Sequence, residues 1–190
     1  TMVTYADVAV IANPGASERR AEIPGAELAV RSLGYRIARI TAPGTLDGGD
    51  VLKHDRTVWV GVGDRTNSEG ARQLAAALEP LGARVVEVPI SKVLHLKSAV
   101  TALPDGTVLG HPSFVDDPSV FDKYLEVPEP DGAHVVLLNE DRLLISASAP
   151  KTADLLAERG YTPVPVDISE FEKLEGCVTC LSVRLRGLSS

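Results

Sequence analysis

One pattern recurs along this 190-residue chain about every 40 residues: a strand, a tight turn, a second strand, a helix and a third strand. The middle of the chain shows it most clearly. There we predict a hairpin from residues 51–52 and 58–61, a helix capped by Asn67 and reaching residue 81, and a strand at 84–88. Hairpins between the helices disfavour a doubly wound sheet. The period instead predicts a radial or stacked α/β repeat, in which ring closure protects short sheet edges.

The other elements are predicted from apolar runs, turn residues and helix caps. Strands are expected at residues 8–11, 36–40, 96–103, 107–110, 134–138, 142–146, 161–166 and 180–185, and helices at 27–33, 119–124 and 151–159. Gly34 is expected to end the first of these helices. Residues 43–50 are expected to form a loop, because paired glycines and flanking aspartates disfavour regular structure. No linker or low-complexity segment divides the chain, which predicts a single domain over residues 1–190.

Composition narrows the class of protein. The formal net charge of -7 disfavours binding to nucleic-acid phosphates, and 4% aromatic residues are too few for a base-stacking surface. No apolar run approaches the roughly 20 residues of a membrane span. Two cysteines three positions apart do not make a disulfide framework, so we expect a cytoplasmic protein.

Three residues carry the chemistry of a nucleophilic site. Cys180 offers a thiol, His95 an imidazole, and Asp47 a carboxylate in a glycine-rich loop. In such a site the thiolate attacks, the imidazole moves protons and the carboxylate orients the imidazole. Taken singly, a cysteine, a histidine or an aspartate in such a setting more often has a structural role than a catalytic one. Asp50 is expected to act as a turn former that ties its loop to neighbouring backbone amides.

Five short sequence motifs, which include these three residues, are spread in order along most of the chain. They are Pro14-Gly15-Ala16-Ser17-Glu18-Arg19-Arg20, Leu46-Asp47-Gly48-Gly49-Asp50-Val51-Leu52, Arg65-Thr66-Asn67, Leu94-His95-Leu96-Lys97-Ser98 and Thr179-Cys180-Leu181-Ser182-Val183. In content and order they resemble the dimethylarginine dimethylaminohydrolase family of the pentein superfamily. The resemblance implies an α/β fold, a pentein-type propeller of five ββαβ blades around a central site. Since an acidic pair of the family falls just before Thr1, it also implies a partial catalytic domain that lacks about one to two N-terminal blades.

The resemblance further implies hydrolysis of a small-molecule methylated arginine to L-citrulline and a methylamine, without a cofactor or a metal. Cys180 would attack the guanidinium carbon, His95 would transfer protons, and Asp47 would hold the imidazole. Arg19 and Arg65 would bind the substrate α-carboxylate, since a guanidinium suits bidentate binding. The backbone carbonyl near Leu174 would meet the substrate amine. A homo-oligomer is left open.

Three alternatives stay open from the sequence. The same fold could serve an arginine or agmatine deiminase or an amidinotransferase. The chain could also be a non-catalytic fragment. Finally, Cys177 and Cys180 could form a redox or metal-binding pair, and Cys180 with His95 could bind an inhibitory zinc ion. A redox pair normally opens a helix, whereas here a strand is predicted, which disfavours that alternative.

Overall fold

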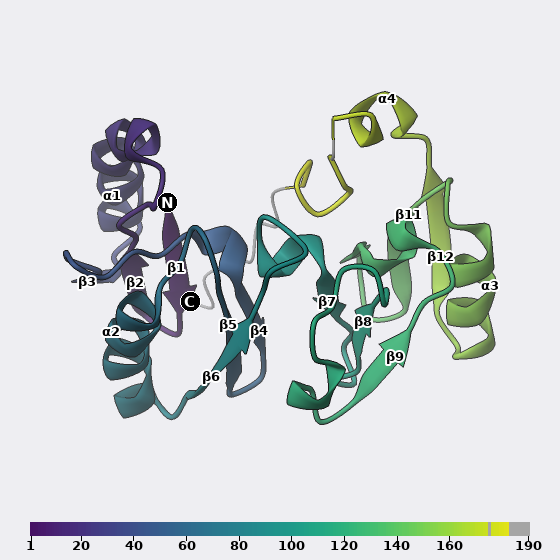
Figure 1. Ribbon diagram of the computed structural model, residues 1–190, viewed down its shortest axis with the longest axis horizontal. Helices are drawn as coiled ribbons and strands as arrows, with labels where there is room; N and C mark the ends of the chain where they lie inside the picture. Colours follow the sequence, from purple (N-terminus) through teal and green to yellow (C-terminus); the bar gives the residue numbers. More distant parts are fainter. Residues whose placement is uncertain (175, 183–190) are drawn as a thin grey trace. The chain divides into compact units, whose positions relative to one another are not determined.

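The computed structural model describes residues 1–174 and 176–182. Within these residues the chain forms four three-stranded sheets of identical topology (Figure 1). In each sheet the first two strands are antiparallel, and the third strand is parallel to the middle one. The predicted repeat is therefore confirmed. The chain divides into two compact units: residues 1–97 with 115–121, and residues 98–114 with those described from 122 onward.

The first sheet of the first unit contains β1 (Met2–Tyr5), β2 (Val8–Ile11) and β3 (Arg36–Arg39). Helix α1 (Ile23–Ser32) connects β2 to β3 and is followed by Gly34 at a φ of 82°, as predicted for a helix-ending glycine. Strand β1 was not predicted. Its turn to β2 uses Ala6 at a φ of 46° instead of glycine or asparagine, so the usual sequence signal of a hairpin is missing.

The second sheet contains β4 (Val51–His54), β5 (Thr57–Val62) and β6 (Arg84–Pro89). Helix α2 (Ser68–Leu78) connects β5 to β6, begins after Asn67 as predicted, and continues into a 3-10 turn at Glu79–Leu81. The loop expected at residues 43–50 ends in a short 3-10 helix, Gly48–Asp50, immediately before β4. Asp50, the last residue of this 3-10 helix, therefore directly precedes the first strand of the second sheet.

Strand β2 is buried on both of its faces, which explains its unbroken apolar sequence. Alternate side chains of a strand point to opposite faces. Val8 and Val10 belong to a core shared with the second sheet and α2, whereas Ala9 and Ile11 pack with Val30 of α1. Leu46 is fully buried in the shared core and anchors the loop that carries Asp47.

The second unit repeats the arrangement with shorter elements. Its strands are β7 (Val100–Ala102), β8 (Val108–Gly110), β9 (Tyr124–Glu126), β10 (Val135–Leu137), β11 (Arg142–Ser146) and β12 (Thr162–Val166), and its helices are α3 (Pro150–Glu158) and α4 (Ser169–Glu172). Leu109, Leu143, Ile145 and Leu156 are fully buried in one core cluster formed by both sheets and α3. Among the residues that the structure describes, no helix is long and apolar enough to cross a membrane.

Three predicted elements differ from the structure. The helix expected at 119–124 is a 3-10 turn, Pro118–Val120, and Tyr124 already belongs to strand β9. A proline and β-prone residues leave too few helix formers there for a stable helix. The strand expected at 96–103 begins only at Val100, after a 3-10 turn at Leu96–Ser98. Of the strand expected at 180–185, Cys180 and Leu181 lie in a turn, and residues 183–185 fall outside the described residues.

Candidate active site

Asp50 is the centre of a polar cluster in the first unit. Its side chain is fully buried, and its two oxygens have three partners. Oδ2 accepts a hydrogen bond from Thr66 Oγ1 at 2.6 Å, and Oδ1 accepts one from the backbone N–H of Leu96 at 3.1 Å. Oδ1 also lies 3.1 Å from His95 Nδ1. These partners offset the cost of burying a carboxylate and fix the position of the histidine segment.

The Asp50 contact selects one form of the imidazole. A carboxylate only accepts hydrogen bonds, so the contact requires a proton on His95 Nδ1. In a neutral ring the lone pair is then on Nε2, and the His95 side chain is 20% exposed. His95 is thus held at one nitrogen and keeps the other for proton transfer.

Gly49 explains how the imidazole reaches Asp50. A Cβ atom at Gly49 would lie 2.7 Å from His95 Cγ and 3.0 Å from Nδ1. The ring therefore rests directly on the backbone of the 3-10 helix, and any side chain at position 49 would displace it. A Cβ at Gly61 would similarly lie 2.8 Å from Leu96 Cβ. Two glycines thus leave the space that the histidine segment occupies.

Asp47 is buried beside this cluster but does not share its contacts. Its backbone N–H donates to Thr66 Oγ1 at 3.0 Å. Its Oδ1 has no hydrogen-bond partner among the described residues, and Arg19 Nη1 lies 3.6 Å away, close enough for an ion pair but too far for a hydrogen bond. Asp47 therefore keeps an open acceptor, which is unusual for a buried carboxylate.

Arg19 is held mainly by a carboxylate of its own turn. Its Nε and Nη2 donate to the two oxygens of Glu22, each at 3.1 Å. This pairing raises the pKa of Arg19 and lowers that of Glu22. The Arg19 side chain is 38% exposed, so it is open to solvent despite the pairing.

Arg65 lies next to the segment that leads to Arg19. A Cβ at Gly15 would come within 2.6 Å of the Arg65 carbonyl oxygen, so only glycine allows these two backbones to approach so closely. The first unit thereby brings together the segments of both arginines that were predicted to bind a substrate carboxylate.

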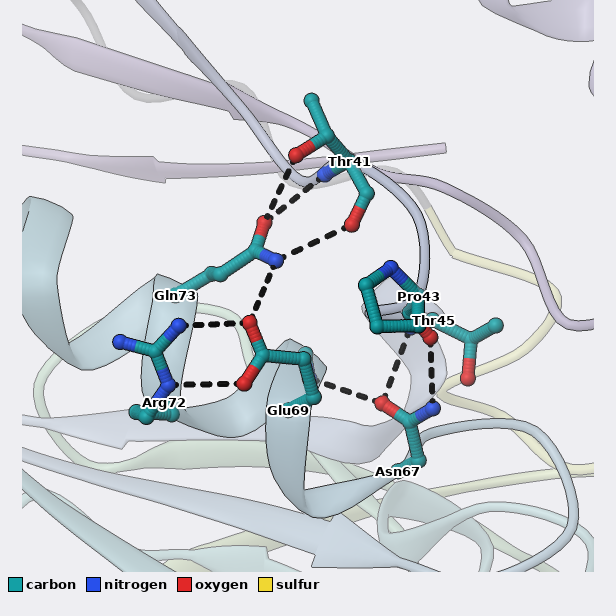
Figure 2. A network of polar contacts seen from close by, with 8 residues as sticks. Thr41, Pro43, Thr45, Asn67, Glu69, Arg72 and Gln73 are labelled. Atoms are coloured by element: carbon teal, nitrogen blue, oxygen red, sulfur yellow. Dashed lines mark hydrogen bonds and ion pairs between the residues drawn. The ribbon is translucent and has the colours of Figure 1, made fainter.

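Asn67 ties the start of α2 to the loop that carries Asp47 (Figure 2). Its Oδ1 accepts from Gly70 N at 2.8 Å, as an N-cap, and from Thr45 N at 3.0 Å. Its Nδ2 donates to the Pro43 carbonyl oxygen at 2.9 Å. A Cβ at Gly70 would lie 1.9 Å from the Thr45 carbonyl oxygen, so the helix and the loop are in direct backbone contact.

A second set of contacts in Figure 2 holds the beginning of the same loop. Gln73 accepts from Thr41 N at 2.8 Å and donates to Thr41 O at 3.0 Å. Its Nε2 also donates to Glu69, which pairs with Arg72. The Arg72 hydrogen bond is the main reason why the pKa of Glu69 falls to about 2. The loop from Thr41 to Thr45 is therefore anchored on α2 at both of its ends.

The predicted nucleophile lies in the second unit. Cys180 is exposed and Cys177 is buried, and neither forms a disulfide. The two sulfur atoms are 3.2 Å apart, and Cys177 Sγ lies 3.0 Å from Thr179 Oγ1. Burial raises the pKa of the Cys177 thiol. Leu174, which precedes this turn, is 85% exposed, and its backbone N–H donates to Phe171 O at 2.9 Å.

The structure thus collects most predicted site residues in the first unit: Asp47, His95, Arg19 and Arg65. Cys180 and Leu174 belong to the second unit. Sequence reasoning missed the contact of Asp50 with the histidine, although the backbone-tying role expected for Asp50 agrees with its bond to Leu96 N. An aspartate directly before a buried strand was the available signal, but its partner is 45 positions away.

Known proteins resemble this chain over most of its length. The model of a family described as "Arginine deiminase" matches residues 29–145. An N(G),N(G)-dimethylarginine dimethylaminohydrolase of Streptomyces coelicolor is 65% identical over 187 residues, which cover 98% of this chain and 72% of that protein. A protein of the same name from Pseudomonas aeruginosa is 38% identical over 180 residues, covering 93% of this chain and 70% of that one.

Solved structures show the same similarity. The crystallised dimethylarginine dimethylaminohydrolase of Pseudomonas aeruginosa, as a cysteine-to-serine mutant complexed with citrulline, matches with a TM-score of 0.85 at 34% identity. The match covers 97% of this chain and 73% of that one. Another structure of a dimethylarginine dimethylaminohydrolase is an adduct with S-methyl-L-thiocitrulline, and it matches with the same TM-score.

Proposed function

Because this chain belongs to the dimethylarginine dimethylaminohydrolase family, we propose that it hydrolyses Nω,Nω-dimethyl-L-arginine or Nω-monomethyl-L-arginine to L-citrulline and the methylated amine. The observation that carries this proposal is the 65% identity to a relative of that name over 98% of the chain. The chain is a hydrolase of the C–N bond of linear amidines, and its four sheets are blades of the pentein fold. Its partner is a small molecule, a methylated arginine. The cytoplasmic location stays a prediction.

Cys180 is the nucleophile of the proposed reaction. A guanidinium is a poor electrophile because its charge is delocalised, and thiolate is the strongest nucleophile among side chains. The exposed position of Cys180 leaves its sulfur open to a substrate, whereas Cys177 is buried and its raised pKa keeps it a thiol. Attack on the guanidinium carbon gives a covalent thiouronium after the amine has left.

His95 moves the protons. Its Nε2 accepts the proton of the Cys180 thiol and gives it to the departing methylamine. It then takes a proton from the water that attacks the thiouronium carbon and returns it to the Cys180 sulfur as citrulline leaves. The Asp50 contact at Nδ1 supports this role, since it fixes the ring and stabilises the positive charge that forms when Nε2 is protonated. We therefore add Asp50 as a positioning residue for His95.

Asp47, Arg19 and Arg65 complete the proposed site. Oδ1 of buried Asp47 accepts no hydrogen bond from the described residues and has only the 3.6 Å ion pair with Arg19, which supports a role toward a further cation, either the imidazolium of His95 or the substrate guanidinium. Arg19 and Arg65 are proposed to bind the substrate α-carboxylate. For Arg19 this means exchanging the Glu22 carboxylate for that of the substrate. The carbonyl near Leu174 is proposed to accept from the substrate amine.

A second candidate reaction is the deimination of unmethylated arginine. It is favoured by the family model, whose matched residues 29–145 include Asp47, Asp50 and His95. Both reactions proceed through the same covalent chemistry and differ in the amine that leaves. The relatives that are 65% and 38% identical to this chain carry the name of the methylarginine enzyme, which favours the first candidate.

A substrate panel separates the candidates. Citrulline release is measured with dimethylarginine, monomethylarginine and arginine, and carbamoylputrescine release is measured with agmatine. We expect turnover of the two methylated arginines and little turnover of arginine. Faster turnover of arginine would favour the deiminase. A folded chain that turns over none of the four would contradict the hydrolase and favour a non-catalytic role.

A further inference from the structure

The two cysteines of this chain lie side by side with their sulfur atoms 3.2 Å apart. Their environments differ sharply. Cys180 is exposed to solvent, whereas Cys177 is buried and packed against the hydroxyl of Thr179. An exposed thiol next to a buried one is the arrangement in which the first meets an oxidant and the second can react with the product.

The backbone holds the two thiols on one side of a turn. Leu181 N donates to Cys177 O at 3.1 Å, which closes one helical turn, and residues at positions i and i+3 of such a turn share a face. Ser182 Oγ donates to Val178 O at 2.6 Å and reinforces the same turn. The strand expected after Cys180 had disfavoured a redox pair. The structure has a helical turn there and no strand at Cys180. This removes the objection, because redox pairs with two residues between the cysteines normally lie at the start of a helix.

We propose that Cys177 and Cys180 form a reversible intramolecular disulfide when a hydroperoxide oxidises Cys180. The pair is then a redox modification site. Its consequence for activity rests on the proposed function, in which Cys180 is the nucleophile. A Cys180 sulfur bonded to Cys177 cannot attack a guanidinium, so oxidation switches the enzyme off and reduction restores it.

The oxidation balances in two steps. The Cys180 thiolate attacks one oxygen of hydrogen peroxide, the O–O bond breaks, and a sulfenic acid forms, while the leaving hydroxide takes up the proton that the Cys180 thiol had lost and becomes water. Cys177 sulfur then attacks the Cys180 sulfur, the S–O bond breaks, and the Cys177 proton leaves with the hydroxide as water. Two thiols are oxidised and one peroxide is reduced to two waters. The sulfur atoms must approach from 3.2 Å to the bond length of about 2.05 Å, which a small side-chain rotation in the turn provides.

The environments of the two cysteines assign them different roles in the oxidation: Cys180 reacts with the peroxide, and Cys177 reacts with the product. The burial that raises the pKa of Cys177 keeps its thiol protonated and shields it from the oxidant. Cys177 is nevertheless adjacent to any sulfenic acid on Cys180, so the disulfide forms before a second peroxide arrives. The pair would thus protect Cys180 from irreversible oxidation to the sulfinic acid.

The test follows the mass and the free thiols of the full 190-residue chain during treatment with hydrogen peroxide. In the wild type we expect a loss of about 2 Da, the disappearance of both alkylatable thiols, and recovery of both with dithiothreitol. In Cys177→Ser we expect a gain of about 32 Da on Cys180 that dithiothreitol does not reverse. Thr179→Val keeps both cysteines and serves as the matched control, which should still form the disulfide.

These outcomes separate the inference from the proposed function. The mass readout needs no catalysis, so a chain that forms the disulfide but never releases citrulline would refute the function alone. An active chain whose Cys180 gains oxygen equally fast with and without Cys177 would overturn the inference alone. Disulfide-linked dimers as the main product on a non-reducing gel would also overturn it, because they would show that Cys180 reacts with another copy.

Discussion

Gly49→Ala should inactivate the enzyme without unfolding it. The added methyl would lie 2.7 Å from His95 Cγ, whereas an ordinary contact begins at 3.4 Å. The imidazole must therefore shift by at least about 0.7 Å, and a shift of that size away from Asp50 would lengthen the 3.1 Å contact of Nδ1 to about 3.8 Å, beyond hydrogen-bond range. Since a misplacement of about 1 Å in an active site can cost roughly 100-fold in rate, we expect kcat to fall about that much.

The loss of stability should be small. Gly49 is not among the glycines with positive φ, so alanine fits its backbone, and the displaced ring is partly exposed. Loss of one hydrogen bond costs about 1 kcal/mol, which lowers Tm by only a few degrees in a chain of this size. The assay combines citrulline release with thermal unfolding. Gly25→Ala is the matched control, because a Cβ there meets nothing within 4 Å, and it should keep full activity. A folded Gly49→Ala enzyme with kcat within about threefold of wild type would show that the position of the imidazole does not depend on the absence of a side chain at residue 49.

Three further predictions follow from the site and the core. Asp50→Asn should lower kcat by about 100-fold or more with little change in KM, because it disturbs the histidine and not substrate binding; steady-state kinetics showing only a raised KM would contradict the contact at 3.1 Å. Arg65→Ala should raise KM for dimethylarginine by roughly 10- to 100-fold with kcat less affected, and an unchanged KM would remove Arg65 from carboxylate binding. His134 is buried, its Nε2 donates to Ser98 O at 2.9 Å, and burial lowers its pKa below the ordinary 6.5. The unfolded chain therefore binds a proton at about pH 6.5 that the folded chain does not, so the free energy of unfolding should fall as pH drops below that value, by up to about 1.4 kcal/mol per unit. Denaturation at several pH values should show that the free energy of unfolding depends less steeply on pH in His134→Gln than in the control His111→Gln, which replaces a half-buried histidine. Equal pH dependence in the two variants would be inconsistent with a buried neutral His134.

Local sequence signals predicted most of the fold. These signals are hydrophobic runs, the helix cap at Asn67 and the helix-ending Gly34. They succeed where the conformation of an element is decided by residues close to it in the sequence. Where the signal was unusual the prediction failed. The hairpin of β1 turns at Ala6 without glycine or asparagine, and the 3-10 turn at Pro118–Val120 is too short to show a helical period.

For the candidate site, the sequence offered a set of residues but not the contacts between them. His95, Asp47 and Cys180 stand in segments that resemble a known family. Which carboxylate meets the imidazole depends on how a loop packs against a segment 45 residues later, and no local pattern encodes that distance. The same holds for the 3.2 Å approach of Cys177, which depends on a turn where a strand was expected.

Cys180 is the residue on which the proposed hydrolysis of methylated arginine depends. The most direct measurement is citrulline release from dimethylarginine by the 190-residue chain beside Cys180→Ser and Cys177→Ser. We predict turnover by the wild type and Cys177→Ser and none by Cys180→Ser. Equal loss in both cysteine variants, or undiminished citrulline release by a folded Cys180→Ser chain, would contradict it.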